Sequence, residues 1–195
     1  MVTIGADIHI HCEYKGEDGL WHNCDNHIWN DKENKYEFDD IYWGRNYDLF
    51  GVLAGVRSNQ FPMIDSPRGL PEDMSAKTKE YADEWKGDGH SYSYLTLKEL
   101  LKWKKKMTKK WKKLLKKHNN EISGTDSYYG KYIAEHETDS WGDGWTDVTY
   151  EYEHQVLNYL IKLLKIKMSN HIFCYEKDDY YEKGDNFRIV FWFDS

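Results

Sequence analysis

The chain has 195 residues, a net charge of -7 and an aromatic share of 16%, which together indicate a single folded domain with a sizeable core. Its three cysteines are too few, and odd in number, for a disulfide-stapled scaffold, which favours a reducing cytoplasm. We see no signal-peptide pattern and no apolar run of about 18 residues, so we expect a cytoplasmic protein that does not engage a membrane.

The first predicted strand, residues 2–14, alternates apolar and ionisable side chains. Because a strand sends successive side chains to opposite faces, its even positions from Ile4 to Tyr14 are expected to line a core. The opposite face then carries four titratable groups in a row. They belong to Asp7, His9, His11 and Glu13. Such a row suits a metal, a proton-transfer site or a polar ligand.

Two local signals anchor the rest of the chain. The 15–19 turn predicts a hairpin, and Thr96 with Glu99 forms a capping box that opens a long helix. The predicted elements after the first strand are a strand at 19–29, a loop at 30–44, a helix at 46–56, a loop at 57–75, a helix at 76–85 capped by Ser75, turns at 86–91, a helix from Leu97 to about Lys117, an insertion at 119–148, a helix at about 149–168, and a hairpin of strands 171–176 and 186–193.

This order predicts an α+β fold over residues 1–195, with one domain and an insertion at 119–148. In that fold the N- and C-terminal strands form an antiparallel sheet, and the helices pack on one face of it.

The segment 102–117 carries ten lysines and no acid, so the rest of the chain has a net charge of -17. Its lysines surround an apolar stripe, which favours a solvated helix face that balances an acidic body. The alternative is a surface that pairs with an acidic protein. We expect neither nucleic-acid nor membrane binding from it.

The spacing Asp7-x-His9-x-His11 resembles the first-strand metal motif of amidohydrolases and related phosphoesterases. Those families need a barrel longer than this chain, so the alternative is a polar sheet face whose histidines bond to their neighbours. A second set, His22-x-Cys24-x2-His27, lacks a second ligand pair and would not share one strand face. We therefore expect no metal and no other cofactor.

Three of the four arginines, Arg45, Arg57 and Arg68, fall within 24 residues of a chain that otherwise uses lysine. The planar guanidinium suits a phosphate or carboxylate, and Asn46 and Tyr47 stand beside Arg45 at a predicted helix start that offers further donors. The structural alternative is that Arg57 and Arg68 pair with nearby carboxylates. Those carboxylates belong to Asp48, Glu72 and Asp73.

The run Gly87-Asp88-Gly89-His90-Ser91-Tyr92-Ser93 is a glycine-rich turn that offers one imidazole and two serine hydroxyls. His90 and Ser91 are therefore candidates to cradle an anion or to transfer a proton. The alternative is a plain turn before the capped helix.

Four segments, ADIHIHCEY near the start, RNYDLFGVLAGVR (45–57), SPRGLPEDMS (66–75) and DGHSYSYLTLKELL (88–101), resemble a family of small uncharacterised proteins common in phage and prophage genomes. The resemblance covers roughly the first 101 residues. It implies a context rather than an activity, since small phage proteins often counter host defence by sequestering or cleaving nucleotide second messengers.

The leading hypothesis is thus a phage anti-defence protein that sequesters a cyclic dinucleotide or an ADP-ribose derivative, and an oligomer with pockets at subunit interfaces is expected. Arg45, Arg57 and Arg68 would hold phosphates, and Tyr47 would stack on the base. The polar contacts would come from His9, His11, Asn46, His90 and Ser91.

Two alternatives stay open. The first is a phosphodiesterase in which His9 and His11 act as acid and base, with His90 as a third catalytic candidate, or in which His9 and His11 bind a metal with Asp7. The second is an inhibitor of a host defence protein that uses the lysine-rich helix.

Overall fold

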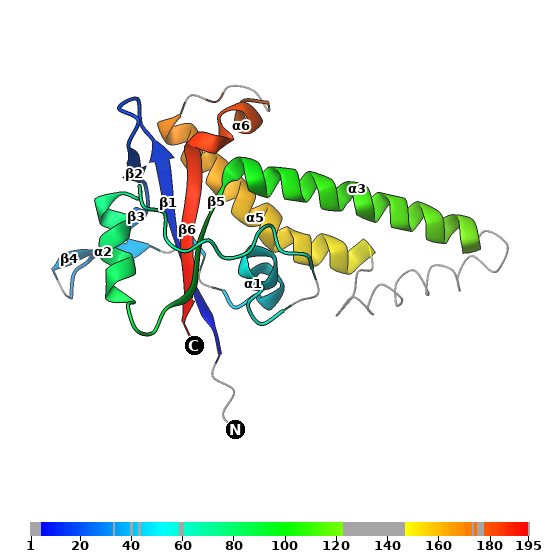
Figure 1. Ribbon diagram of the computed structural model, residues 1–195, viewed down its shortest axis with the longest axis horizontal. Coiled ribbons are helices and arrows are strands. Elements are labelled where there is room, and N and C mark those ends of the chain that lie inside the picture. The colour runs from blue at the N-terminus through cyan, green and yellow to red at the C-terminus, as the bar shows by residue number, and fades with distance from the viewer. Residues whose placement is uncertain are drawn as a thin grey trace.

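A four-stranded antiparallel sheet forms the centre of the molecule (Figure 1). The computed structural model describes residues 5–32, 34–39, 41–42, 44–58, 61–122, 147–172, 174 and 178–194. The strands of the central sheet, in spatial order, are β2 (Trp21–Asn23), β1 (Asp7–Lys15), β6 (Phe187–Asp194) and β5 (His90–Thr96). A separate two-stranded sheet pairs β3 (Asn26–Asn30) with β4 (Lys35–Asp39).

The two middle strands come from opposite ends of the chain. β1 and β6 pair along their whole length, from Asp7 opposite Asp194 to Tyr14 opposite Phe187. Every residue of β6 from Phe187 to Phe193 is buried. A strand that is buried throughout needs other elements packed on both faces of its sheet, and different elements cover the two faces here.

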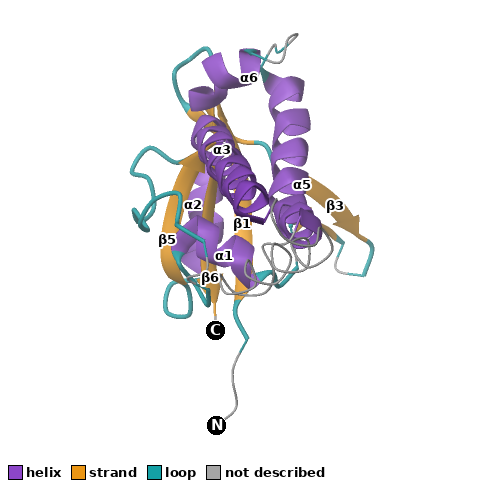
Figure 2. Ribbon diagram, turned by 90° about the vertical axis from the view of Figure 1, so that its right-hand side faces the viewer, coloured by secondary structure: helices purple, strands orange, loops and turns teal. Residues whose placement is uncertain are grey.

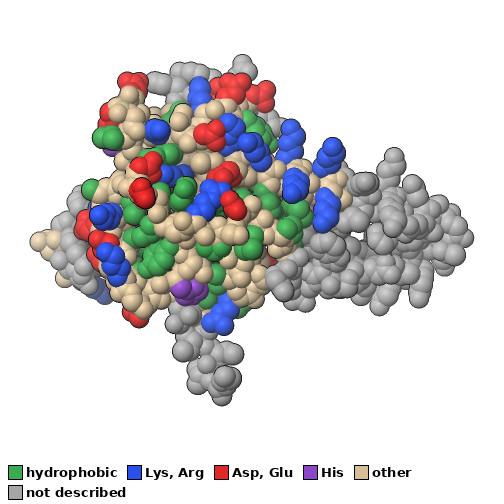
Figure 3. Space-filling view, in the orientation of Figure 1, with side chains coloured by type: hydrophobic (Ala, Val, Ile, Leu, Met, Phe, Trp, Pro, Cys, Tyr) green, Lys and Arg blue, Asp and Glu red, His purple; other side chains and the backbone are tan. Residues whose placement is uncertain are grey.

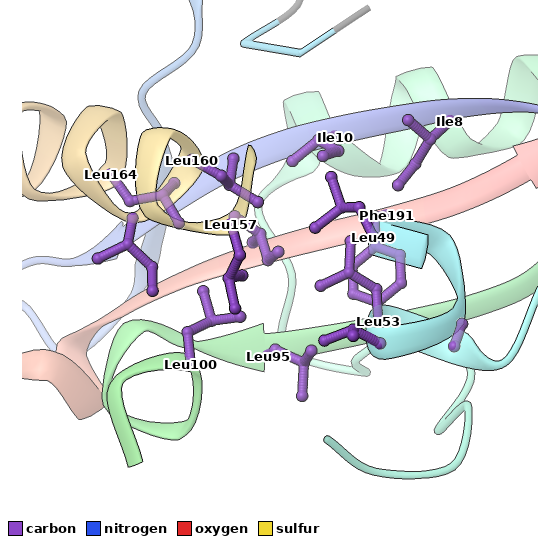
Figure 4. Close-up of a cluster of buried hydrophobic side chains, with 14 of the residues drawn as sticks. Ile8, Ile10, Leu49, Leu53, Leu95, Leu100, Leu157, Leu160, Leu164 and Phe191 are labelled. Carbon is purple, nitrogen blue, oxygen red and sulfur yellow. The ribbon is translucent and has the colours of Figure 1, made fainter. Parts of the chain in front are cut away.

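Three helices cover the apolar face of the sheet (Figure 2). They are α1 (Tyr47–Ala54), α3 (Leu97–Ile122) and α5 (Asp147–His171). Figure 4 shows how Ile8, Ile10 and Phe191 of the sheet meet leucines of these helices. The α+β class, with an antiparallel sheet of terminal strands and helices packed on one face, is therefore confirmed.

The opposite face of the sheet carries the short helix α2 (Ala76–Glu84) and the residue that ends it. Tyr81 of α2 stacks on His11, with ring centroids 4.7 Å apart, and Trp85 lies 4.1 Å from the ring of His9. This second, smaller layer covers His9 and His11 in the row of ionisable residues on β1.

Local signals set the helix boundaries close to their predicted positions. The Asn46 side chain accepts a hydrogen bond from the Leu49 N–H at 2.8 Å, and Gly55 ends α1 in the left-handed conformation. Ser75 caps α2, and the Thr96–Glu99 capping box forms as predicted, with both reciprocal bonds present.

Four predicted elements are corrected. The 19–29 strand is divided into β2 and β3, and the predicted 30–44 loop contains β4. Residues 90–96, assigned to a turn and the approach to a helix, form β5. The predicted C-terminal hairpin is wrong, because β6 has β1 and β5 as its two neighbours, His171 belongs to α5, and α6 (Asp179–Glu182) with the 3-10 turn η2 (Gly184–Asn186) precedes β6.

Most of the predicted insertion lies outside the described residues, since α3 extends to Ile122 and α5 starts at Asp147.

Within the described parts of the chain, no helix combines the length and the apolar character needed to cross a membrane.

Candidate functional site

The ionisable row of β1 lies on the face opposite the core, as predicted: Ile8, Ile10 and Cys12 are buried in the core cluster. Each member of the row has its own partner on another element. Asp7 pairs with Arg45, and its two carboxylate oxygens lie 2.5 and 2.6 Å from the guanidinium. The Arg45 guanidinium is the main reason why the pKa of the Asp7 carboxyl is lowered.

His11 is covered from both sides. Its ring lies between Tyr81 and Trp192, 4.7 and 4.8 Å away, and only 2% of the residue is exposed. Nδ1 of His11 lies 2.9 Å from the carboxylate of Asp25, which also accepts a bond from the Cys12 N–H. A histidine held in this way stabilises the fold and has no open path to a ligand.

His9 lies one step along the same face, against Trp85 and beside the carboxylate of Asp194, which is 3.7 Å from Nε2. Burial lowers the pKa of His9, and the Asp194 carboxylate only partly offsets this effect. The surroundings of His9 therefore favour its neutral form.

Glu13 forms a buried ion pair with Arg188 of β6, with 2.8 Å between the two groups. Arg188 also donates to Asp73 and stacks over the ring of Trp21 at 3.9 Å. Since Ser75 N–H donates to the second oxygen of Glu13, this network attaches the segment before α2 to the sheet.

No metal site emerges from the predicted ligand sets. Among the residues that the structure describes, no group of three histidine, cysteine, aspartate or glutamate side chains can hold a metal ion. In the second set, His22 bonds to Asp18, His27 bonds to Tyr81, and burial raises the pKa of the Cys24 thiol to about 12.

The three candidate arginines do not converge on one site. Arg68 is bound by the carboxylates of Asp65 and Glu99, at 2.7 and 2.6 Å, beside β5. Arg45 pairs with Asp7 at the start of β1, which β6 separates from β5 in the sheet. Arg57 follows α1 with a left-handed backbone, φ 60°. The structural alternative thus describes Arg68, although its partners are not the predicted carboxylates.

The other candidates are also placed apart. Asn46 caps α1, and Tyr47 packs its ring against Phe50. His90 lies within hydrogen-bond distance of its neighbour Ser91, 3.0 Å from Nδ1 to Oγ, at an irregularity between β5 and β6.

A different cluster of chemistry-bearing side chains lies between α3, α5 and α6. On α3, Leu101, Lys104, Lys105, Thr108 and Lys109 recur at helical spacing and therefore share one face. With Lys165 of α5 and with Asp178 and Tyr181 around α6, they line a groove of about 600 Å³, which we call the first groove. Basic side chains gather along α3 on the face drawn in Figure 3.

A second groove of about 450 Å³ adjoins the first, since Lys104 and Lys165 line both. Its remaining lining comes from α5 and from Tyr180 of α6. Those α5 residues are Asn158, Ile161, Lys162, Ile166, Ser169 and Asn170. The short helix α6, which contains Tyr180 and Tyr181, lies at the end of the α3–α5 pair (Figure 2).

The two grooves concentrate positive charge. Five lysines line them, and Asp178 is the one acidic side chain among their described lining residues. Each groove also has a tyrosine beside a lysine: the Lys105 ammonium lies 5.8 Å from the Tyr181 ring, and that of Lys165 lies 4.6 Å from the Tyr180 ring. A concave surface that carries mainly positive charge attracts anions.

From the sequence alone, only the α3 lysines of this site could be identified as a group. The lysines of 102–117 were evident, but their interpretation as a solvated face left out α5 and α6. Tyr180 and Tyr181 were assigned to a hairpin turn.

Comparisons with family models, with curated proteins and with solved structures found no match for this chain.

Proposed function

We propose that this protein binds a phosphate-bearing nucleotide in the first groove and withholds it from its receptor. The observation that carries the proposal is the grouping of Lys104, Lys105, Lys109 and Lys165 around one concave surface with Tyr181. Ammonium groups form charge-assisted hydrogen bonds with phosphate oxygens, and a tyrosine ring stacks on a base. The volume of the groove lies within the range of small-molecule sites.

The proposed ligand class is an immune second messenger, a cyclic dinucleotide or an ADP-ribose derivative. Its context comes from the four segments that resemble small phage proteins, which makes an anti-defence role in the host cytoplasm the proposed setting. Self-association of the chain remains part of this proposal and is measured in the same samples by light scattering.

Binding without cleavage is the proposed outcome because of what lines the groove. Among its described lining residues there is no histidine, and its ionisable side chains are lysines, Tyr181 and Asp178. His9 and His11 lie on the sheet face that α2 covers, where His11 is stacked between two rings. A bound nucleotide should therefore be recovered intact.

The test is isothermal titration of the protein with cyclic dinucleotides and ADP-ribose, followed by chromatography of the nucleotide. Lys105→Glu combined with Lys109→Glu should weaken binding at least tenfold, since each charge-assisted bond contributes about 1.5–3 kcal/mol. The matched control is Lys79→Glu, which reverses an exposed charge on α2.

Each alternative has its own signature in this experiment. If Arg45→Ala removes binding and the lysine reversals do not, the ligand lies at the arginines and the first groove is the wrong site. Conversion of the nucleotide to product, abolished by His9→Ala, would make the protein a phosphodiesterase. Failure of every nucleotide to bind would refute the proposal and leave an acidic protein partner for α3.

A further inference from the structure

We infer that the ligand consists of two nucleotide units joined through phosphate, with one unit in each groove. This inference rests on the proposed function and adds the form of the ligand to it. Its first support is that the two grooves are not separate sites. Lys104 of α3 and Lys165 of α5 line both, so the pair of ammonium groups marks the place where the grooves meet.

The second support is that the grooves have similar linings. The first contains Lys105 and Tyr181 as a cation-π pair, and the second contains Lys165 and Tyr180 as another. The tyrosines are neighbours in α6, so one short helix supplies an aromatic ring to each groove. A ligand with two similar halves fits such a pair of linings better than a ligand with one phosphate-bearing end.

The third support is an acceptor without a donor. Oδ1 of Asn158, a residue that lines the second groove, is buried and has no hydrogen-bond partner among the described residues. Leaving such an atom unpaired is unfavourable, so a ligand that brings a donor is stabilised there. Nucleotides carry suitable donors in the exocyclic amine of the base and in the ribose hydroxyls.

Together these features define one arrangement. The phosphate linkage lies at Lys104 and Lys165, one unit extends along Lys105 and Tyr181, and the other reaches Asn158 beside Tyr180. Binding of one half places the other half at high local concentration, so the joined ligand binds much more tightly than a single nucleotide.

The experiment compares AMP with two diadenylates, linear pApA and cyclic di-AMP, by isothermal titration with the full chain. We expect the tighter of the two diadenylates to bind once per chain and about 100-fold more tightly than AMP. If AMP binds once per chain and as tightly as either diadenylate, the inference is wrong while the proposed function stands. If none of the three binds, the inference is wrong, and the titration with the other cyclic dinucleotides and with ADP-ribose decides the proposed function.

Variants in the second groove separate the two halves. Asn158→Leu should weaken diadenylate binding about tenfold and leave unchanged the affinity for the AMP that occupies the first groove. If Asn158→Leu does not fold, Tyr180→Ala replaces it and should have the same effect. The control is Tyr159→Ala, an exposed tyrosine of α5 that lines neither groove. Equal effects of Asn158→Leu and Tyr180→Ala on AMP and on diadenylate would overturn the assignment of the second groove.

Discussion

Glu13 and Arg188 form an ion pair inside the protein, with side chains 0% and 4% exposed and 2.8 Å between the carboxylate and the guanidinium. They are 175 positions apart in the chain and adjacent in the register of β1 and β6. Asp73 and Trp21 complete the surroundings of the guanidinium, so the pair joins the sheet to the segment that precedes α2.

Removing the arginine from this pair should destabilise the protein strongly. Arg188→Met leaves the Glu13 carboxylate buried without its counter-ion, and we expect the free energy of unfolding to fall by about 3–5 kcal/mol. Urea denaturation followed by fluorescence measures the change. Lys77→Met, which breaks the exposed pair with Glu80, is the control and should change it by less than about 1 kcal/mol. If both variants lost a similar, small amount of unfolding free energy, burial would not make the Glu13–Arg188 pair more important than an exposed ion pair.

The Asp25 carboxylate should be more important to the fold than its size suggests. It accepts hydrogen bonds from the Cys12 N–H at 2.7 Å and from the Asn23 side chain at 2.6 Å, and it lies 2.9 Å from Nδ1 of His11. Asp25→Ala leaves several buried donors unpaired, so we expect a loss of about 3 kcal/mol or more in urea denaturation.

Asp18→Ala is the matched control, because the Asp18 carboxylate contacts His22 on the exposed turn after β1. Its effect on the free energy of unfolding should be much smaller than that of Asp25→Ala, because the Asp18 carboxylate is exposed. If Asp25→Ala were as mild as Asp18→Ala, the buried network around His11 would not contribute to stability.

The sequence predicted those parts of the fold that depend on neighbours in the chain. Alternation assigned the two faces of β1, and the Thr96–Glu99 box marked the start of α3. β5 was missed because its residues lie between a glycine-rich turn and that box, and the strand is defined by its pairing with β6, about 100 positions later.

The site was harder to predict than the fold for the same reason. Whether Arg68 binds a ligand depends on Asp65 and Glu99, of which Glu99 is 31 positions away. The grooves need α3, α5 and α6 together, and no local pattern reports that Lys104 and Lys165 meet. Residue types at one position indicate a chemistry, whereas the partners supplied by folding decide whether that chemistry is accessible.

Stability should decrease as the pH falls from 7 to 5. Burial lowers the pKa of His9 in the folded protein, whereas in the unfolded chain it titrates near 6.5. The unfolded state therefore binds a proton first: the stabilisation is complete above about pH 6.5 and is lost as the pH falls through the folded-state pKa. Burial, together with the Lys167 charge, lowers the pKa of His171 as well, which adds to this dependence.

Melting temperatures at several pH values between 5 and 8 test this prediction. His9→Phe keeps a ring against Trp85 and removes the titration, so its melting temperature should depend less on pH than that of the unmodified protein. Adding His171→Phe should reduce the dependence further. An unchanged pH dependence in His9→Phe would show that its protonation is not linked to folding.

The two core cysteines should be inert toward thiol reagents while the protein is folded. Burial raises the pKa of Cys24 to about 12 and also raises the pKa of Cys12 well above its usual range, so neither side chain forms the reactive thiolate at pH 8. Cys174 is only partly buried and should be labelled first. Mass spectrometry after iodoacetamide treatment, with and without urea, measures the order; rapid labelling of Cys24 without urea would contradict it.

Nucleotide affinity should fall as salt rises, because the two adjoining grooves present five lysines and one acidic side chain among their described lining residues. Raising sodium chloride from about 0.1 M to about 1 M shortens the screening length from roughly 10 Å to 3 Å, which weakens attraction between the open grooves and a phosphate. Titration calorimetry across this range gives the slope of affinity against salt. Lys105→Glu with Lys109→Glu should flatten that slope, and Lys79→Glu should preserve it. An affinity that does not depend on salt would mean that uncharged contacts hold the ligand and that the lysines of α3 lie outside its site.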